Sequence, residues 1–465
     1  MTQLGHNVTQ AGTDYQSYSP KDLAEAVHSE LLRRTTSSPE LVVLIELFES
    51  MYFASLKTEE SKPVAFHVVY LNPENPDPKP PKVTVHNRWS CVRLAKPVPL
   101  RGANFLKIAV ASDPRTSSFA VHQDSEGRLV LWGLIDQGNS YHDYVNFDSD
   151  SGPERPGLFQ ASITGIAHLV AYINYEKVAE LKQNSLLRSA IDILQSGPVR
   201  EALEPGIRSH LEAVQQELPE FFGGKPWDWQ RPVVEDWLSA IRRLLLRIQN
   251  IRHGGAFLLT SDQSLQGLSV KHKIVYDRLR SSLERHAVAK AEQFLASDEI
   301  QQEFLEENAE EMPVGLHLDE IVAGYDLEEI RSELDGTIWF ISLLTRVDGL
   351  VLLNHKLEVQ GFGVEITVPN KPSEIFIAGD TGATEARLKK VNYQLYGTRH
   401  RSMMRYCANV PGSVGFIISQ DGDVRVVTKV GDRLVMWDNI RLQLPKFVRR
   451  RKKRRRVANP SALPE

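Results

Sequence analysis

The hydrophobic residues of the N-terminal half follow two different patterns. Over residues 21–60 they recur at three- and four-residue steps, which predicts helices. From about 63 to 135 they form short runs separated by segments rich in Pro, Asn, Asp and Gly, which is typical of strands and turns. A further helix is expected near 164–190, so residues 21–195 are predicted to form an α+β domain. The predicted strands of this domain cover 65–70, 82–86, 105–111 and 129–135.

The C-terminal half begins with a segment that carries Pro and Gly, and we expect residues 196–231 to be a connector. After Pro232, apolar residues at helical spacing predict an amphipathic helix. This helix should end before Gly254 and Gly255, where a buried strand starts. Helices are expected over 270–345. The later predicted strands cover 349–353, 357–366, 415–419 and 423–428.

This order of elements predicts an α/β domain, with a mixed sheet flanked by helices, over residues 232–445. An acidic helical insert is expected near 270–335. Residues 1–20 are polar and are expected to be disordered, and residues 446–465 form a polybasic tail. The chain is therefore predicted to contain two folded domains.

The composition is that of a globular protein. Of the 465 residues, 42% are hydrophobic and 25% are charged, which excludes a mostly disordered or fibrous chain. No uncharged apolar run reaches the length of about 18 residues that a transmembrane helix needs, and the N-terminus lacks the pattern of a secretion signal. Cys91 and Cys407 are isolated, which fits a reducing compartment. We therefore expect a cytoplasmic protein.

Charge is distributed unevenly, although the net charge is only −4. Lys446 and the eight basic residues of 449–456 carry nine positive charges, and without them 46 basic and 59 acidic residues remain, a net charge of −13. Residues 298–335 hold fourteen carboxylates and a single cation, Arg331. The basic tail is either a solubilising end or a patch for an anionic polymer or an anionic lipid surface.

Three clusters in the C-terminal half carry groups suited to phosphate and metal chemistry. The first is Asp348-Gly349, between a predicted helix and a predicted strand. The second is the run Gly-Thr-Arg-His-Arg at 397–401, which enters a helical stretch, and the third is Ser-Gln-Asp-Gly at 419–422, which includes a hairpin-type turn. Each cluster taken alone is typical of a turn or a solvated surface.

Taken together, the clusters supply the parts of a nucleotidyl transferase. Two arginines and a histidine at a helix N-terminus offer hydrogen-bond donors and positive charge to a polyphosphate. An aspartate at a strand edge can bind Mg²⁺ or Mn²⁺ or polarise a hydroxyl group. Gly254 and Gly255 leave room for a base or a ribose to approach the backbone.

The three clusters resemble, in order and spacing, the motifs DGA, GTRHR and SEE of the diadenylate cyclase domain, the nucleotide-binding domain of DNA-integrity scanning cyclases. The helix that ends at 252–255 is similar to the opening helix of that domain, and the resemblance covers roughly 232–445 with the acidic stretch as an insertion. The N-terminal half looks like the probable sensor domains, of the type called DACNV, that precede such cyclases in bacteria.

The resemblance implies an activity and a set of site residues. Two ATP molecules, one on each protomer of a face-to-face homodimer, would condense into the second messenger cyclic di-AMP with the loss of two pyrophosphates. Asp348 would be the catalytic residue and would bind Mg²⁺ or Mn²⁺, with Asp421 as a second metal ligand. The residues implied to bind the nucleotide are Gly254, Gly255, Gly349, Thr398, Arg399, His400, Arg401 and Ser419.

The chain departs from the family pattern at Leu350, Gln420, Asp421 and Ser402, and two functions stay open. Leu350 replaces alanine and is expected to add bulk beside the nucleotide, Gln420 replaces a possible metal-binding glutamate with a neutral amide, and Ser402 stands where alanine is usual. Asp348 and the complete run 397–401 favour a sensor-regulated cyclase. Gln420 favours a receptor with a cyclase fold that binds ATP or a related nucleotide without turnover.

Overall fold

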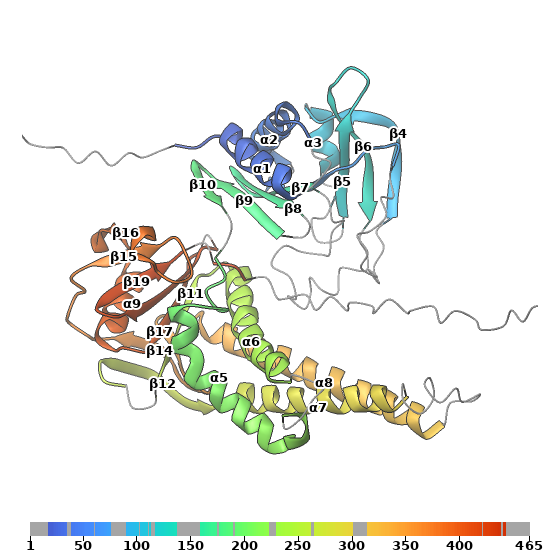
Figure 1. The fold of residues 1–465 in the computed structure, drawn as a ribbon. Helices are drawn as coiled ribbons and strands as arrows, with labels where there is room; N and C mark the ends of the chain where they lie inside the picture. Colours follow the sequence, from blue (N-terminus) through green and yellow to red (C-terminus); the bar gives the residue numbers. More distant parts are fainter. Residues whose placement is uncertain are drawn as a thin grey trace, which may run out of the picture. The chain divides into compact units, whose positions relative to one another are not determined.

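The computed structural model arranges the chain in two units, each built around its own sheet (Figure 1). The described residues up to 188 form the first unit, and those from 191 to 442 form the second. This arrangement confirms the prediction of an α/β protein with two domains. The structure describes residues 17–34, 39–59, 61–75, 90–101, 103–109, 111–112, 117–136, 159–173, 176–188, 191–222, 229–261, 265–300, 314–420, 422–438 and 440–442.

The first unit consists of a mixed sheet with helices against one face. Its helices are α1 (Pro20–Arg34), α2 (Leu41–Ser55) and α3 (Ala103–Ala109). Its strands are β1 (Thr58–Glu59), β2 (Lys62–Pro63), β3 (His67–Tyr70), β4 (Ser90–Pro99), β5 (Ser117–Gln123), β6 (Leu129–Asp136), β7 (Phe159–Gly165), β8 (His168–Ile173), β9 (Glu176–Lys182) and β10 (Ser185–Arg188). In the described residues the main sheet has the order β10-β9-β8-β7-β3-β5-β6-β4, with β3 parallel to β5 and the other neighbouring pairs antiparallel. Apolar side chains of the three helices and of alternate strand residues share one core.

Two predictions for the first unit were wrong. Residues 105–111 were expected to form a strand, but 103–109 form α3, in which Phe105 and Ala109 are buried one helical turn apart. A short apolar run fits a strand or a buried helix equally well by pattern alone. The helix expected near 164–190 is a series of antiparallel strands instead, because tight turns with positive φ at Ala167 and Gln183 reverse the chain. The predicted strand 82–86 lies outside the described residues.

The second unit has three layers, with a mixed sheet between two layers of helices. Its helices are α5 (Pro198–Glu217), α6 (Gln230–Ile251), α7 (Arg278–Ile300), α8 (Val314–Leu344) and α9 (Thr398–Asn409), with short 3₁₀ turns η2 (Pro219–Phe221), η4 (Glu385–Arg387) and η5 (Tyr393–Leu395). Its strands are β11 (Gly255–Thr260), β12 (Leu268–Tyr276), β13 (Leu350–Asn354), β14 (Val359–Ile366), β15 (Ile375–Ala378), β16 (Leu388–Val391), β17 (Val414–Ile418), β18 (Val424–Val430) and β19 (Arg433–Trp437). The described strands follow the order β12-β14-β13-β11-β17-β18-β19-β15-β16.

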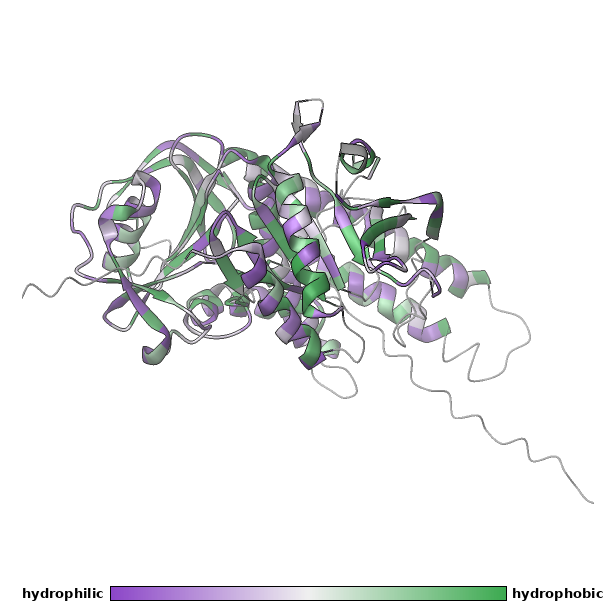
Figure 2. Cartoon of the chain, turned by 90° about the horizontal axis from the view of Figure 1, so that it is seen from above, coloured by the Kyte–Doolittle hydropathy of each residue, from purple (hydrophilic) through white to green (hydrophobic). Residues whose placement is uncertain are grey.

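Burial explains why the second unit takes this form. Helices α5 to α8 share one apolar core with one face of the sheet, and α9 packs on the opposite face. All six residues of β11 are buried, as expected of a central strand with both faces covered. Figure 2 shows the strands as largely apolar and the helices as mixed, with apolar and hydrophilic residues on different sides.

Two segments of the second unit differ from the prediction. Residues 198–217, expected to belong to a connector, form α5, whose Leu203 and Ile207 are buried in the main core. Pro198 occupies the first turn of this helix, where its missing N–H group costs nothing. Residues 270–276, expected to be helical, belong to β12 at the edge of the sheet, where half-buried residues are interspersed with exposed ones.

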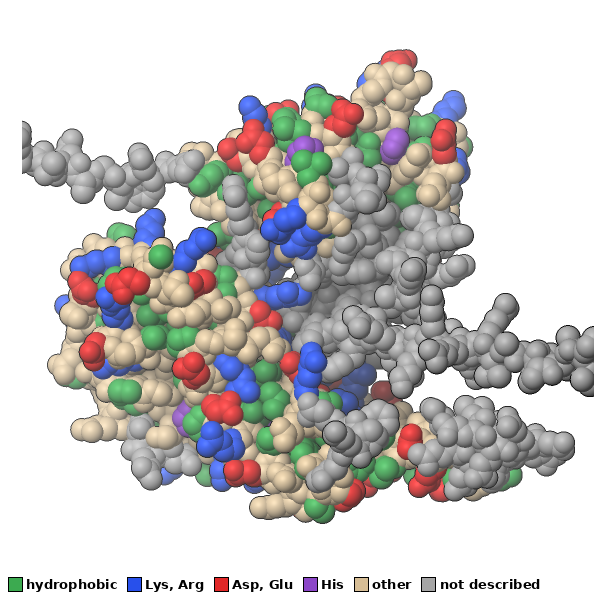
Figure 3. All heavy atoms as spheres, viewed as in Figure 1, with side chains coloured by type: hydrophobic (Ala, Val, Ile, Leu, Met, Phe, Trp, Pro, Cys, Tyr) green, Lys and Arg blue, Asp and Glu red, His purple; other side chains and the backbone are tan. Residues whose placement is uncertain are grey.

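The charged parts of the second unit are partly compensated within the described residues. Glu333 on α8 accepts hydrogen bonds from Arg278 and Arg285, and these bonds hold the pKa of its carboxyl at about 2. Figure 3 shows acidic and basic side chains interspersed over the visible face of this unit. Residues 301–313 of the acidic insert and the basic tail lie outside the described residues. None of the described helices is long and apolar enough to cross a lipid bilayer.

The burial of α5 leads to a stability prediction. Leu203→Ala removes a side chain with no exposed surface from the main core of the second unit, so its free energy of unfolding should fall by about 2–5 kcal/mol. Hydrogen exchange of β11 peptides at increasing urea concentrations measures this change. Glu204→Ala, on the same helix and paired only with Arg200 among the described residues, is the matched control and should change stability by less than about 0.5 kcal/mol. Equal effects of the two substitutions would show that α5 does not belong to the core.

Candidate functional site

The pairing of three central strands brings the predicted motifs to one edge of the second sheet. β11 is parallel to β13 and antiparallel to β17, so the start of β11, the start of β13 and the end of β17 lie side by side. Gly255 pairs with Ile418, and the register of Phe257 with Val351 sets Gly255 level with Gly349. Since neighbouring strands are about 5 Å apart, Asp348 and Ser419 lie within about two strand spacings of each other. We call this place the glycine edge.

The N-terminus of α9 meets the glycine edge through Arg399. A Cβ atom added to Gly254 would lie 3.1 Å from Nη1 of Arg399 and 3.2 Å from the backbone nitrogen of Gln420. Gly254 also has a φ of +72°, which favours glycine. The guanidinium of Arg399 therefore packs directly over bare backbone, and a side chain at 254 would displace it.

His400 lies beside Arg399 on α9 and contacts the strand next to β17. Nη1 of Arg425, on β18, is 3.1 Å from Nε2 of His400. Burial lowers the pKa of His400 to about 4, and the positive charges of Arg425 and Arg399 act in the same direction, whereas Asp423 opposes them. The imidazole is therefore uncharged at neutral pH, and the positive charge of this part of the site comes from the two arginines.

Ser419 forms the turn that connects β17 to β18. Its Oγ accepts a hydrogen bond from the backbone N–H of Asp423 at 3.0 Å, and its own backbone N–H donates to the carbonyl oxygen of Asp423 at 2.9 Å. Nε2 of Gln249 donates to the carbonyl oxygen of Gly422 at 2.7 Å, which ties the turn to α6. Because Oγ accepts in this turn, its hydroxyl proton remains able to donate to a ligand.

Asp348 lies on the other side of the glycine edge, between the end of α8 and the start of β13, as predicted. Its carboxylate is exposed. A hydrogen bond to Glu365 raises the pKa of Lys271, and the charge of Asp348 contributes to the same shift. Gly349 has a φ of +115°, and a Cβ atom there would come within 2.6 Å of the carbonyl carbon of Gly363. The Asp-Gly pair thus needs glycine for a close backbone contact.

The glycine edge presents the exposed carboxylate of Asp348 as a possible metal ligand. Across the described ranges, no group of three or more His, Cys, Asp or Glu side chains forms a metal site. Asp421, the second expected ligand, lies outside the described residues. Mg²⁺ is commonly held by one or two carboxylates together with substrate phosphates, and Asp348 can supply one such carboxylate.

The remaining predicted residues are near the start of α9. Thr398 is exposed in the first turn. The backbone carbonyl of Arg401 accepts a hydrogen bond from the hydroxyl of Tyr393 at 3.1 Å, and within the described ranges its guanidinium makes no hydrogen bond or ion pair. Gly397 precedes the helix and provides no side-chain cap, so the first backbone N–H groups of α9 stay available to an anion.

The residues that differ from the family motifs lie in different environments. Leu350 was expected to add bulk beside the nucleotide, but its side chain is buried in the core beneath α9 with Met403 and Met404. This prediction was wrong because Leu350 is the first residue of β13 and points into the sheet's core face. Gln420 is exposed at the glycine edge, beside Gly254. Ser402 accepts a hydrogen bond from Arg405 on the same helix.

Two residues of the site were not predicted from the sequence. Arg425 contacts His400 and lies 3.7 Å from Asp423. Asp438 follows β19, level with the start of β18, and burial raises the pKa of its carboxyl while Arg425 opposes that shift. The available signal was a lone arginine within the apolar run 424–427, a position that is usually occupied by an apolar residue in a central strand.

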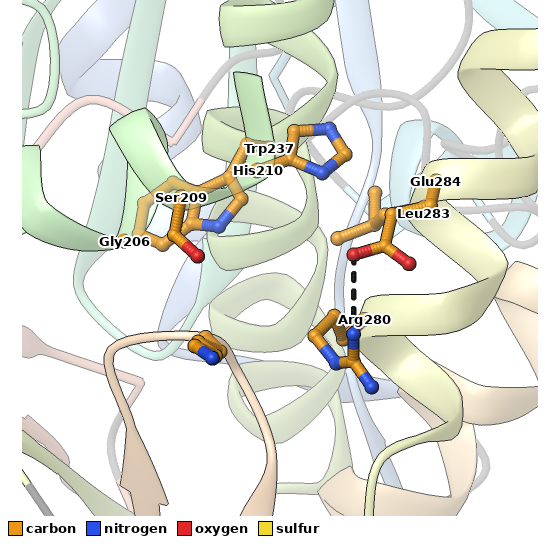
Figure 4. A pocket seen from close by; sticks show the side chains of 8 residues that line it. Gly206, Ser209, His210, Trp237, Arg280, Leu283 and Glu284 are labelled. Carbon is orange, nitrogen blue, oxygen red and sulfur yellow. Dashed lines mark hydrogen bonds and ion pairs between the residues drawn. The ribbon is translucent and has the colours of Figure 1, made fainter. Parts of the chain in front are cut away.

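A small pocket in the helical layer is not part of this site (Figure 4). It has room for about one water molecule, about 10 Å³, which is too small for a nucleotide. His210 lies in this pocket, and burial lowers the pKa of its imidazole to about 4. The lining residues are Gly206, Ser209, His210, Trp237, Arg280, Leu283, Glu284 and Lys356.

Comparison with known families supports part of the resemblance. Residues 33–136 match the family described as "Probable sensor domain DACNV". The matched segment lies in the first unit and ends with β6, so it includes α2 and α3. The prediction of a sensor domain in this half of the chain is therefore confirmed. No curated protein matches the sequence.

The close contact at Gly349 leads to a second prediction. Gly349→Ala should lower the free energy of unfolding of the second unit by about 2 kcal/mol or more, because the new methyl group meets backbone atoms at a positive φ. Hydrogen exchange of β13 peptides in urea would measure the loss. Gly324→Ala on α8 is the control, because a Cβ atom there meets nothing within 4 Å. It should raise the free energy of unfolding by about 0.5–1 kcal/mol. A neutral effect of Gly349→Ala would contradict the backbone contact.

Proposed function

We propose that the protein is a sensor-regulated diadenylate cyclase. It condenses two ATP molecules into cyclic di-AMP and releases two pyrophosphates. One observation carries this proposal: four segments that are far apart in the sequence meet at the glycine edge, with a guanidinium over bare backbone on one side and an exposed carboxylate on the other. The segments are 254–255, 348–349, 397–401 and 419–420.

The α9 side of the edge would bind the triphosphate. Arg399 and Arg401 offer charge-assisted hydrogen bonds, and the uncapped first turn of α9 offers backbone N–H groups to the same anion. The hydroxyl of Ser419 adds a neutral donor from the adjacent strand end. Gly254 lets the Arg399 guanidinium lie against the backbone, whereas Gly255, also expected to shape the nucleoside pocket, faces Ile248 and Thr345 in the core and is not open to a nucleoside.

The β13 side would act on the ribose. Mg²⁺ or Mn²⁺ held by Asp348 and phosphate oxygens would reduce the negative charge on the phosphates. The Asp348 carboxylate orients the 3′-hydroxyl and accepts its proton as the oxygen bonds to the α-phosphorus of the second ATP. The bond from that phosphorus to the pyrophosphate oxygen breaks, and pyrophosphate leaves. Two such attacks close the ring, so two protomers related by a twofold axis would be needed.

The first unit would control this reaction. Its match to a probable sensor domain favours a role in detecting a signal rather than in chemistry. The sensor would change the rate of cyclic di-AMP formation by the second unit.

A second function, nucleotide binding without turnover, is favoured by the metal side of the site. Gln420 replaces an anionic ligand with a neutral amide, and Asp348 is one carboxylate without a preformed cluster in the described residues.

One experiment separates the two functions: incubation of the purified protein with ATP and Mg²⁺ or Mn²⁺, followed by mass spectrometry for cyclic di-AMP. An Arg399→Ala, Arg401→Ala double variant is the control, since its affinity for ATP should fall at least about tenfold. If the protein binds ATP and forms no cyclic di-AMP, it acts as a nucleotide receptor and not as a cyclase.

The role of Asp348 leads to a prediction for the reaction. Asp348→Asn keeps the shape of the side chain and removes its charge, so cyclic di-AMP formation should fall at least about a hundredfold. ATP binding, measured by calorimetry without metal, should be retained because the phosphate donors lie on α9. Asp432→Asn, in the exposed turn between β18 and β19, is the matched control and should keep full activity. Full activity of Asp348→Asn would remove this residue from the mechanism.

Gln420 leads to a prediction about the metal requirement. A neutral amide offers a metal one weak oxygen ligand, whereas a glutamate offers an anion and up to two oxygens. Gln420→Glu should therefore raise the rate of cyclic di-AMP formation at low metal concentration or lower the concentration of Mn²⁺ at half-maximal rate. A titration of the initial rate with Mn²⁺ for both proteins measures this. If the two curves coincide, Gln420 does not act near the metal.

A further inference from the structure

The contact between Arg425 and His400 determines the protonation state of the histidine by geometry alone. The two nitrogens, Nη1 of Arg425 and Nε2 of His400, are 3.1 Å apart. A guanidinium has donors and no acceptor, so Nε2 must accept this hydrogen bond. An imidazole whose Nε2 accepts is neutral and carries its proton on Nδ1. In the described part of the chain, Nδ1 has no hydrogen-bond partner.

The groups around His400 favour the same state. Arg399 on α9 and Arg425 on β18 are both cationic, and Asp423 beside β18 is the acidic group that opposes them. Tyr396 places its ring 5.9 Å from the imidazole, centroid to centroid. Asp423 lies 3.7 Å from Arg425, and the charge of Arg425 opposes the rise in the pKa of Asp438, so two acidic groups as well as the histidine interact with this guanidinium.

We propose that Arg425 is a positioning residue that holds His400 as a neutral imidazole with its proton on Nδ1, so that Nδ1–H donates to a phosphate oxygen of the bound nucleotide. This inference rests on the proposed function for its ligand, and Arg425 itself lies outside the motifs 397–401 and 419–421. The arrangement lets His400 donate a hydrogen bond whose strength does not depend on pH across the physiological range.

The first test is the ¹⁵N spectrum of the histidine side chains in the full-length protein, with His400 assigned by its loss in His400→Gln. In the wild type, Nε2 of His400 should have the chemical shift of an unprotonated nitrogen, and the imidazole should titrate with a pKa of about 4. In Arg425→Met, which has neither charge nor donor, the proton should distribute over both nitrogens, and the pKa of His400 should rise above its wild-type value, although burial and Arg399 still lower it. Arg425→Lys, which retains both, should resemble the wild type.

A control variant distinguishes the effect of Arg425 from the loss of any arginine in this part of the sheet. Arg433→Gln removes an exposed arginine of the neighbouring strand, where it pairs with Glu385, and should leave His400 unchanged. If Arg425→Met does not fold, the wild-type spectrum still decides, because a proton on Nε2 would overturn the proposal. An unchanged tautomer and pKa in folded Arg425→Met would also overturn it.

The second test concerns the nucleotide. The dissociation constant of ATP is measured by calorimetry at about pH 7.5 and about pH 5.5, and the ratio of variant to wild type cancels the titration of the ATP phosphates. This ratio should be about tenfold for Arg425→Met at the higher pH. It should decrease at the lower pH to the extent that the raised pKa makes His400 a cation. A ratio near one at both pH values contradicts a role of Arg425 in holding His400 for the nucleotide. If the wild type binds ATP and forms no cyclic di-AMP, the cyclase proposal fails while this inference stands, and if ATP does not bind, the phosphate role of Nδ1 fails as well.

Discussion

The second unit depends on the double pairing of β11, which lies between β13 on one side and β17 on the other. All residues of β11 are buried, so a shift of one residue in register would turn its side chains to the opposite layer of the core. The same register sets Gly255 level with Gly349 and opposite Ile418. The packing of the core thus fixes the relative positions of the motifs at the glycine edge, without any contact among the motif side chains being required.

Positive charge is concentrated on the α9 side of this edge. Arg399, Arg401 and Arg425 bring three guanidinium groups near the start of α9 and β18, while His400 stays uncharged. Like charges repel at short range, and in a half-buried site this repulsion costs stability. Asp423 and Asp438 offset part of the cost at Arg425. A polyphosphate would offset the rest, which is why we propose phosphate binding on the α9 side.

The sequence predicted the elements whose pattern is local and missed those defined by their partners. The amphipathic helix α6 and the buried strand β11 were predicted, because helical spacing and an apolar run between glycines are visible in the sequence alone. β12 was missed since an edge strand exposes most of its residues and is stabilised by hydrogen bonds to β14. The site follows the same rule: the motif residues were proposed from their order, whereas Arg425 was missed because its contact with His400 joins positions 25 residues apart in the sequence through the packing of α9 against β18.

The two sides of the glycine edge are held by different layers of the second unit. Arg399 and His400 belong to α9, which packs on one face of the sheet, while Asp348 follows α8, which packs on the opposite face. α8 is also tied to α6 by the ion pair of Arg243 with Asp335, at 2.8 Å, and by Arg247 over the ring of Trp339. A movement of α8 would therefore displace the carboxylate of Asp348 and leave the phosphate donors of α9 in place. In the proposed reaction, the attack by the ribose depends on the distance between these two sides, so small shifts of one helical layer would change the rate far more than the affinity for the nucleotide.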